Sequence, residues 1–160
     1  MIAQVLSEMI RMLKHDRAQV EHAMKVYVYA SIIGDLEGLK DDQLRALRAA
    51  AILNDVALPE CLDREGEWNG ELQRRYGEPM AREVLTRLGY DSYADRVGYL
   101  VSHSHNYFHE MHDYLDLQIL IEANFLVNLT DGSCSEKPED VYNRYFATPT
   151  GRALMRDLFF

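Results

Sequence analysis

The spacing of apolar residues constrains the fold of this chain more than any other feature of its sequence. Nearly every segment repeats apolar residues every three to four positions, as in "MIAQVLSEMIRMLK" at its start. This period places apolar side chains along one face of an α-helix. No segment alternates apolar and polar residues convincingly enough to predict a strand. The sequence therefore predicts an all-α fold.

Helix caps and helix-breaking residues divide this pattern into separate expected helices. The second helix is expected to end before Gly34, while Gly77 and Pro79 predict a break in a later one. Loops are expected over 60–70 and over 103–113, the segment "HSHNYFHEMHD". After the first helix, the expected helices are 16–33, 43–56, 71–88, 91–102, 114–129 and two short ones that start at Pro138 and Pro149.

Length and composition favour one compact unit. The chain has 160 residues, of which 48% are hydrophobic and 27% are charged. These values are typical of one globular domain with a hydrophobic core. No internal repeat, low-complexity tract or linker divides the chain. We therefore expect a single domain over residues 1–160, a helical bundle in which the very apolar helix 114–129 is central.

Charge and cysteine content limit the partners and the compartment. The net charge of −9 argues against nucleic acid polymers and anionic membranes as partners, because their phosphates would be repelled. No uncharged run is long enough to span a membrane, and Glu8 and Arg11 interrupt the first helix, which therefore does not predict a signal peptide. Cys61 and Cys134 lack a partner at metal or redox spacing, which favours a cytoplasmic protein.

Three expected helices carry polar residues on their apolar faces. Asn54 and Asp55 fall on the apolar stripe of one helix, Asn124 on that of another, and His22 on that of a third. A buried carboxylate is costly unless it is paired, hydrogen-bonded or bound to a cation. Each of these residues alone is most simply a hydrogen-bonded core side chain. Together they predict one shared polar centre.

Histidines cluster within ten residues of the segment "HSHNYFHEMH", at positions 103, 105, 109 and 112. Residues two apart point to opposite sides of a helix, so His103 and His105 converge only if the helix ends there. Because these two close an apolar helix, they are candidates for the polar centre. For His109 and His112, a solvated loop is the simpler interpretation.

The same residues resemble those of small bacterial HD-domain proteins, which belong to the metal-dependent phosphohydrolase superfamily. That family has a helical His, a helix that ends in His-Asp, and an Asp on a later helix. Here His22 in "DRAQVEHAMKVYVYASIIG" matches the first position, "AAAILNDVA" resembles "AAILHDIG", and "LQILIEANFLVNL" resembles "EADFLVNL". "YLVSHSHNY" resembles "YLIGHHHTY", and the closing "YFATPTGRALMRDLFF" is similar too. The resemblance keeps order and spacing over nearly the whole chain, and it implies an HD-type bundle.

The departures from this family pattern fall on the metal ligands that the resemblance implies. Asn54 stands in place of a His, Asn124 in place of an Asp, and Ser104 in place of the middle one of three histidines, which leaves His22 and Asp55. An amide oxygen is a ligand for Mg²⁺ or Ca²⁺ but a poor one for Zn²⁺ or Fe. Since the metal is what acidifies an attacking water, the implied hydrolysis is expected to be weakened or lost.

Two functions of different classes stay open. The first is a metal-dependent phosphohydrolase that acts on a phosphomonoester or a nucleotide, with Asp55 catalytic and Lys25 bound to the substrate phosphate. Lys25 is equally explained as a solvated surface residue. The cofactor implied is a divalent ion (Mn, Mg, Fe, Co, Ni or Zn) in a shifted site. Its expected ligands are His22, Asp55, His103 and His105.

The second function is that of an inactive HD pseudoenzyme, whose pocket binds a small ligand or serves as a protein-interaction module. In this alternative, Asn54 and Asn124 satisfy Asp55 and His22 by hydrogen bonds in place of the ion. Two replacements at one site, one that removes an imidazole and one that removes a carboxylate, favour this alternative slightly.

Overall fold

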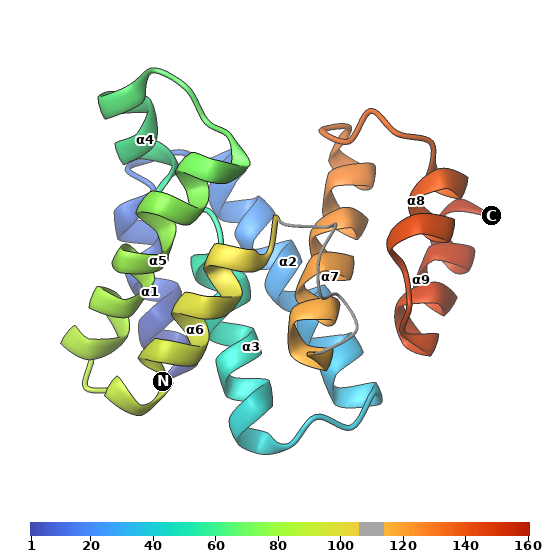
Figure 1. The fold of residues 1–160 in the computed structure, drawn as a ribbon, viewed down its shortest axis with the longest axis horizontal. Coiled ribbons are helices and arrows are strands. Elements are labelled where there is room, and N and C mark those ends of the chain that lie inside the picture. Colours follow the sequence, from blue (N-terminus) through green and yellow to red (C-terminus); the bar gives the residue numbers. More distant parts are fainter. Residues whose placement is uncertain (106–113) are drawn as a thin grey trace.

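The structure, a computed structural model, describes residues 1–105 and 114–160, and every regular element within them is an α-helix. The expected all-α fold is confirmed for these residues. No helix among them is both long and apolar enough to cross a membrane. In chain order, the helices are α1 (Ile2–Met12), α2 (Arg17–Leu36), α3 (Asp41–Leu53), α4 (Leu58–Glu65), α5 (Gly70–Arg87), α6 (Asp91–His103), α7 (Leu115–Asp131), α8 (Pro138–Tyr145) and α9 (Pro149–Phe159) (Figure 1).

Helix α7 lies in the middle of the arrangement (Figure 1). It packs against α2, α3 and α6 on one side and against α8 and α9 on the other. All of its residues from Asp116 to Val127 are buried, on every face of the helix. A helix that is surrounded in this way leaves no face for solvent, which explains why its sequence is so apolar.

The prediction that the second helix ends before Gly34 is wrong, because α2 continues to Leu36. Gly34 is buried inside the helix, where a Cβ atom would lie 2.7 Å from Leu44 Cδ1 and 3.1 Å from Leu47 Cδ2. The glycine therefore allows α3 to approach α2 closely. The left-handed glycine that follows α2 is Gly38, with φ of 77°.

The expected loop over 60–70 contains helix α4, and the third helix ends earlier than expected, at Leu53. Pro59 lies in the first turn of α4, where a missing N–H costs little, so it marks the start of a helix and not only the end of the preceding one. The break expected at Gly77 and Pro79 is also wrong. Helix α5 is continuous, since its packing against α6, the most extensive helix pair of the fold, compensates for the hydrogen bond that proline removes.

The expected loop over 103–113 is only partly described. His103 is the last residue of α6, and Ser104 and His105 form the turn that follows it. His109 and His112 lie outside the described residues.

A buried glutamate fixes the start of α9 against α7. Glu122 is fully buried and accepts hydrogen bonds from Thr148 Oγ1 at 2.7 Å and from the Thr148 backbone N–H at 3.1 Å. Gln118 Nε2 donates to the same carboxyl group at 2.6 Å. Burial raises the pKa of Glu122 above its ordinary value, although these hydrogen bonds oppose the shift. A Cβ atom on Gly151 would lie 1.9 Å from Glu122 Oε1, so only glycine fits there.

Candidate functional site

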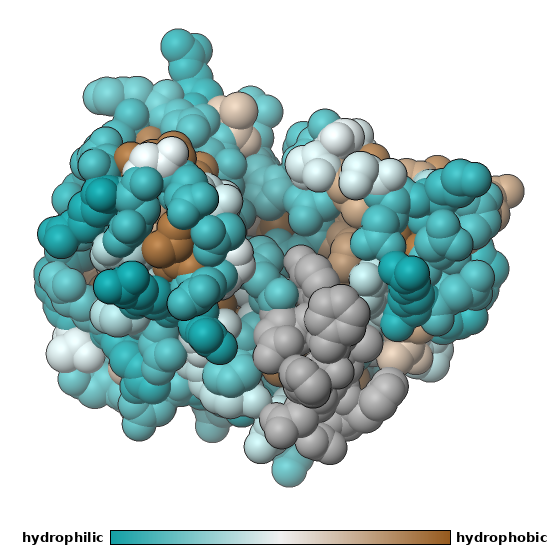
Figure 2. All heavy atoms as spheres, turned by 45° about the horizontal axis from the view of Figure 1, so that its top comes forward, coloured by the Kyte–Doolittle hydropathy of each residue, from teal (hydrophilic) through white to brown (hydrophobic). Residues whose placement is uncertain are grey.

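A polar pocket of about 330 Å³ lies where α2, α5 and α7 meet the turn that follows α3. Figure 2 shows a largely hydrophilic face that is hollowed between the part built from α4 and α5 and the part built from α8 and α9. Among the residues predicted from the sequence, the pocket is lined by His22, Asp55, His105 and Asn124. Asn54 lies beneath the pocket and is 2% exposed. The structure thus brings these five side chains together.

The carboxylate of Asp55 is surrounded by hydrogen-bond donors. Its Oδ2 accepts a hydrogen bond from Gln19 Nε2 at 2.9 Å and lies 3.4 Å from His22 Nε2. Its Oδ1 accepts hydrogen bonds from Gln73 Nε2 and, at 3.3 Å, from Asn54 Nδ2. Since a carboxylate has about four lone-pair positions, these four neighbours occupy its positions for accepting hydrogen bonds.

Asn54 presents an N–H group, and not a lone pair, to the centre of this cluster. Its Nδ2 donates to Asn124 Oδ1 at 3.0 Å, and its Oδ1 accepts a hydrogen bond from Ser104 Oγ at 2.7 Å. Asn124 Nδ2 in turn donates to the backbone carbonyl of Leu120 at 3.1 Å. Every polar atom of the two amides except one hydrogen on Asn124 therefore has a partner within the protein, which is what a stable buried amide pair requires.

His22 lies between two carboxylates. Its Nδ1 is 3.0 Å from Asp131 Oδ2, and its Nε2 is 3.4 Å from Asp55 Oδ2. Both contacts are hydrogen bonds at once only when both ring nitrogens carry hydrogen. Burial alone would raise the pKa of Asp131, but hydrogen bonds from Ser133 and from His22 outweigh it and hold that pKa below its ordinary value.

His105 closes the pocket on the α6 side. Its Nε2 lies 3.5 Å from Asn54 Nδ2 and 3.9 Å from Asp55 Oδ1. Burial lowers the pKa of His105, which the Asp55 carboxylate opposes and the His22 ring reinforces. An imidazole with a lowered pKa is neutral near pH 7, so it offers the pocket one donor and one acceptor.

The remaining predicted site residues lie elsewhere. The ring of His103 stacks on Tyr99, with 4.0 Å between ring centroids, and its Nδ1 lies 2.9 Å from the Tyr99 carbonyl oxygen. It does not line the pocket, so the shifted ligand set loses one of its members. Lys25 lines an adjoining pocket of about 470 Å³, which also contains His22 and Asp131.

Sequence reasoning missed several pocket residues: Gln19, Trp68, Gln73 and Asp131. Two of them carry a periodic signal, because Gln19 precedes His22 by three residues and Asp131 follows Asn124 by seven, which places each pair on one helix face. Gln73 and Trp68 come from a segment with no fixed spacing to the others. Only the packing of α5 beside the turn after α3 brings them to the site.

The residues present do not fit the four-ligand metal centre that the resemblance implies. Asn54 turns hydrogen toward the position of a cation, and Asp55 has no acceptor position left without the displacement of a donor. Within the described residues, no group of three or more His, Cys, Asp or Glu side chains is arranged to hold a metal ion. The donor set is instead that of a hydrogen-bonded polar network.

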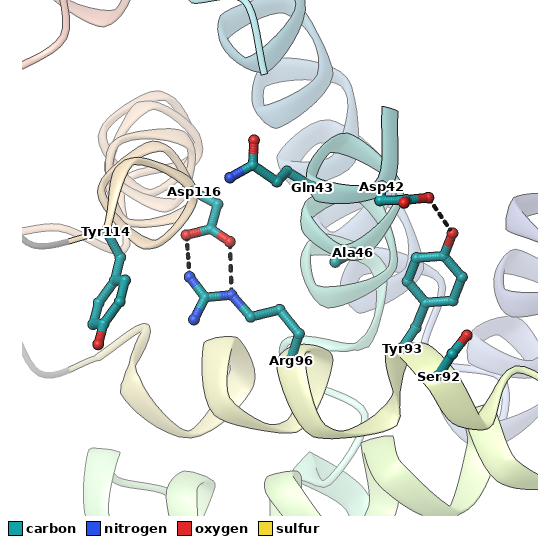
Figure 3. A pocket seen from close by; sticks show the side chains of 8 residues that line it. All are labelled: Asp42, Gln43, Ala46, Ser92, Tyr93, Arg96, Tyr114 and Asp116. Atoms are coloured by element: carbon teal, nitrogen blue, oxygen red, sulfur yellow. Dashed lines mark hydrogen bonds and ion pairs between the residues drawn. The ribbon is translucent and has the colours of Figure 1, made fainter. Parts of the chain in front are cut away.

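A second pocket, of about 550 Å³, lies between α3, α6 and the start of α7 (Figure 3). Arg96 makes two hydrogen bonds to Asp116, at 2.8 Å and 2.5 Å, and its guanidinium lies 4.8 Å from the centroid of the Tyr114 ring. Across the pocket, the Tyr93 hydroxyl donates to Asp42 at 2.9 Å. Because its charged groups are paired with each other, we assign this pocket a structural role.

Comparisons with protein-family models, curated proteins and solved structures found no significant match for this chain. The function is therefore inferred from the residues of the polar pocket themselves.

Proposed function

We propose that this protein is an HD-type helical domain in which a phosphohydrolase centre has become a metal-free ligand-binding pocket. The observation that carries this proposal is the hydrogen-bonding state of Asp55, whose two oxygens are contacted by Gln19, Gln73, Asn54 and His22. In a hydrolase of this type, a divalent cation would occupy that position and acidify the attacking water. Amide N–H groups balance the carboxylate but activate no water.

The charge of the pocket favours a polar ligand without a phosphate. Two carboxylates, of Asp55 and Asp131, flank the imidazole of His22, and burial lowers the pKa of the other imidazole in the pocket, that of His105. A phosphate placed among these groups would meet two negative groups. Lys25, the residue expected to hold a phosphate, lies in the adjoining pocket. The Asn69 and Asn128 amides and the hydroxyl oxygen of Ser133, which line the same pocket, suit a small molecule that carries several hydroxyl or amino groups. Trp68 offers such a molecule a flat apolar surface.

A weakened metal-dependent hydrolase is the second candidate, and one observation favours it. The nearest ring nitrogens of His22 and His105 lie 3.4 Å and 3.9 Å from the Asp55 carboxylate. If the surrounding amides rotate away, these three groups offer a metal two imidazoles and one carboxylate, which is the number of protein ligands in many catalytic zinc sites. In such a site, His22 would bind the metal through Nε2 and donate its Nδ1–H to Asp131, as metal-binding histidines commonly do.

Trp68 provides a direct test, because it is the single tryptophan of the chain and it lines the pocket. Titration with Co²⁺ or Ni²⁺, which quench nearby fluorescence, should leave its emission unchanged at micromolar metal. Purified untagged protein should contain no stoichiometric metal by elemental analysis. It should also hydrolyse no phosphomonoester in a screen with added Mn²⁺, Mg²⁺, Co²⁺ or Ni²⁺.

The opposite results would establish the hydrolase. They are stoichiometric metal, quenching of Trp68, and a phosphatase activity that Asp55→Asn abolishes. A matched pair of probes, adenosine and adenosine 5′-monophosphate, tests the ligand charge, since they differ by one phosphate. If only the phosphorylated probe changes the Trp68 emission, the assignment of an uncharged ligand is wrong, whatever the result for metal.

A further inference from the structure

A ridge of exposed apolar side chains runs along the outer face of α2, away from the polar pocket. Met24, Val28, Ile32 and Leu36 follow one another at intervals of four residues and are 38%, 49%, 37% and 71% exposed. Single exposed apolar residues are ordinary on a protein surface, but a continuous ridge marks an interaction surface. Helices α3 and α7 pack against other faces of α2.

The ridge has an apolar depression near one end and a projecting leucine at the other. An apolar depression of about 250 Å³ is formed by four neighbouring α2 residues, Met24, Lys25, Val28 and Tyr29. Leu36, the most exposed large apolar side chain among the described residues, projects from the other end of the same ridge. A projecting leucine and a depression between four helical residues are the two elements of knobs-into-holes packing.

We propose that this face joins two copies of the chain in a symmetric dimer, with their α2 helices antiparallel. A two-fold axis near Ser31 places Leu36 of each copy in the depression of the other, because the two elements lie at equal distances on either side of that residue. The interface is then the same patch on both copies, as two-fold symmetry requires.

Charge selects the antiparallel orientation over the parallel one. Lys25 borders the depression, and the last turn of α2, beside the projecting Leu36, has no basic residue of its own; Asp35 in that turn is paired with Arg48 of α3 at 2.9 Å. In the antiparallel dimer, Lys25 of each copy lies near the C-terminal end of the other α2, where the helix dipole is negative. A parallel pair would place Lys25 beside Lys25 and Asp35 beside Asp35. This inference is independent of what the polar pocket binds.

Disulfide cross-linking between single-cysteine variants tests the geometry. The background is Cys134→Ser, since Cys61 is buried. Met24→Cys mixed with Leu36→Cys should form a cross-linked dimer on mild oxidation, because the axis brings residue 24 of one copy opposite residues 36–38 of the other. Met24→Cys alone should not cross-link, as its two copies would lie roughly 20 Å apart along the helices. Efficient cross-linking of Met24→Cys alone, or none in the mixture, overturns the arrangement.

Sedimentation velocity from low micromolar to submillimolar concentration tests the surface. The wild type should dimerise reversibly, and Val28→Glu should weaken dimerisation at least tenfold, because the symmetric contact buries the new carboxylate twice. Leu62→Glu on α4 is the matched control, as Leu62 is 48% exposed against 49% for Val28. It should dimerise like the wild type, and circular dichroism should show both variants folded. A monomeric wild type, or a Val28→Glu protein that dimerises as well as the control, refutes the proposal.

Discussion

Introduction of the two metal ligands that the HD resemblance implies is the sharpest perturbation of the polar centre. In the double variant Asn54→His/Asn124→Asp, the hydrogen bonds from Ser104 to Asn54, from Asn54 to Asn124, and from Asn124 to the Leu120 carbonyl are lost. At about 0.5–1.5 kcal/mol each, they contribute roughly 1.5–4.5 kcal/mol. The new carboxylate also lies near Asp55, so the metal-free variant should be less stable than the wild type by at least this amount.

Metal should reverse this loss only in the double variant. His22, the new histidine, Asp55 and the new aspartate then form the four-ligand set, and Mn²⁺ at 100 times its dissociation constant stabilises the folded state by about 2.7 kcal/mol. For a chain of this length, about 2–4 °C accompanies each kcal/mol, so Tm should rise by roughly 5–11 °C. Each single variant should gain much less, because the ligands act as a set.

The assay is thermal unfolding with and without Mn²⁺, read beside the emission of Trp68. Asn54→His/Asn128→Asp is the matched control, since Asn128 lines the same pocket one turn after Asn124 and adds the same charge outside the four positions. Equal, metal-insensitive melting of all three proteins would mean that these positions form no metal cavity. An equal response of the control would mean that charge alone, and not ligand geometry, attracts the ion.

Three further predictions concern the buried charges of the scaffold. Glu122→Gln should remove a pH dependence, because burial raises the pKa of Glu122 above 4.5, the ordinary value of a glutamate. The wild type should therefore lose stability relative to this variant as pH rises from 4.5 through the raised pKa, and a difference that stays constant with pH in urea unfolding would contradict this. Gly151→Ala should cost about 1–3 kcal/mol by the same assay, since its Cβ meets Glu122, and an unchanged midpoint would mean that the α7–α9 contact is looser. Arg96→Met should cost about 1.5–3 kcal/mol, because the buried Asp116 loses its hydrogen bonds from a partly exposed arginine but keeps the one from the Leu117 backbone N–H. Adding Asp116→Asn should recover most of that loss, and a failure to do so would point to lost packing of the Arg96 side chain.

The sequence was sufficient for the fold class because helical spacing is a local property. Sequence reasoning failed where the role of a residue depends on its contact with another helix. Helix-stop rules predict a helix end at Gly34, but this glycine is buried where α2 and α3 meet, and nothing near it in the sequence shows that contact. Proline follows helix ends and also suits a first helical turn, and Pro59 lies in the first turn of α4. Both cases have the same cause. Local rules allow glycine and proline either at a helix end or within a helix, and tertiary contacts decide which of the two occurs.

The same limit applies to the polar centre. His22, Asn54, Asp55 and Asn124 are detectable because each breaks the apolar stripe of its own helix. His103 and His105 are adjacent in the same motif, yet the structure separates them: one stacks on Tyr99 and the other lines the pocket. Their difference depends on where α6 ends, and helix ends are the part of a pattern that sequence defines least well.

The amides around Asp55 explain why a site that departs at two positions from the HD pattern it resembles need not collapse. A carboxylate left without a cation in a buried site would force a change in protonation or in structure. Gln19 and Gln73 come from two other helices and both donate to Asp55, so its charge is balanced by four separate groups, of which Asn54 is only one. Replacement of Gln19 or Gln73 by alanine should therefore make the protein more dependent on the remaining donors. The loss of both should cost more than the sum of the single losses, because each single variant keeps the other donor on the same carboxylate.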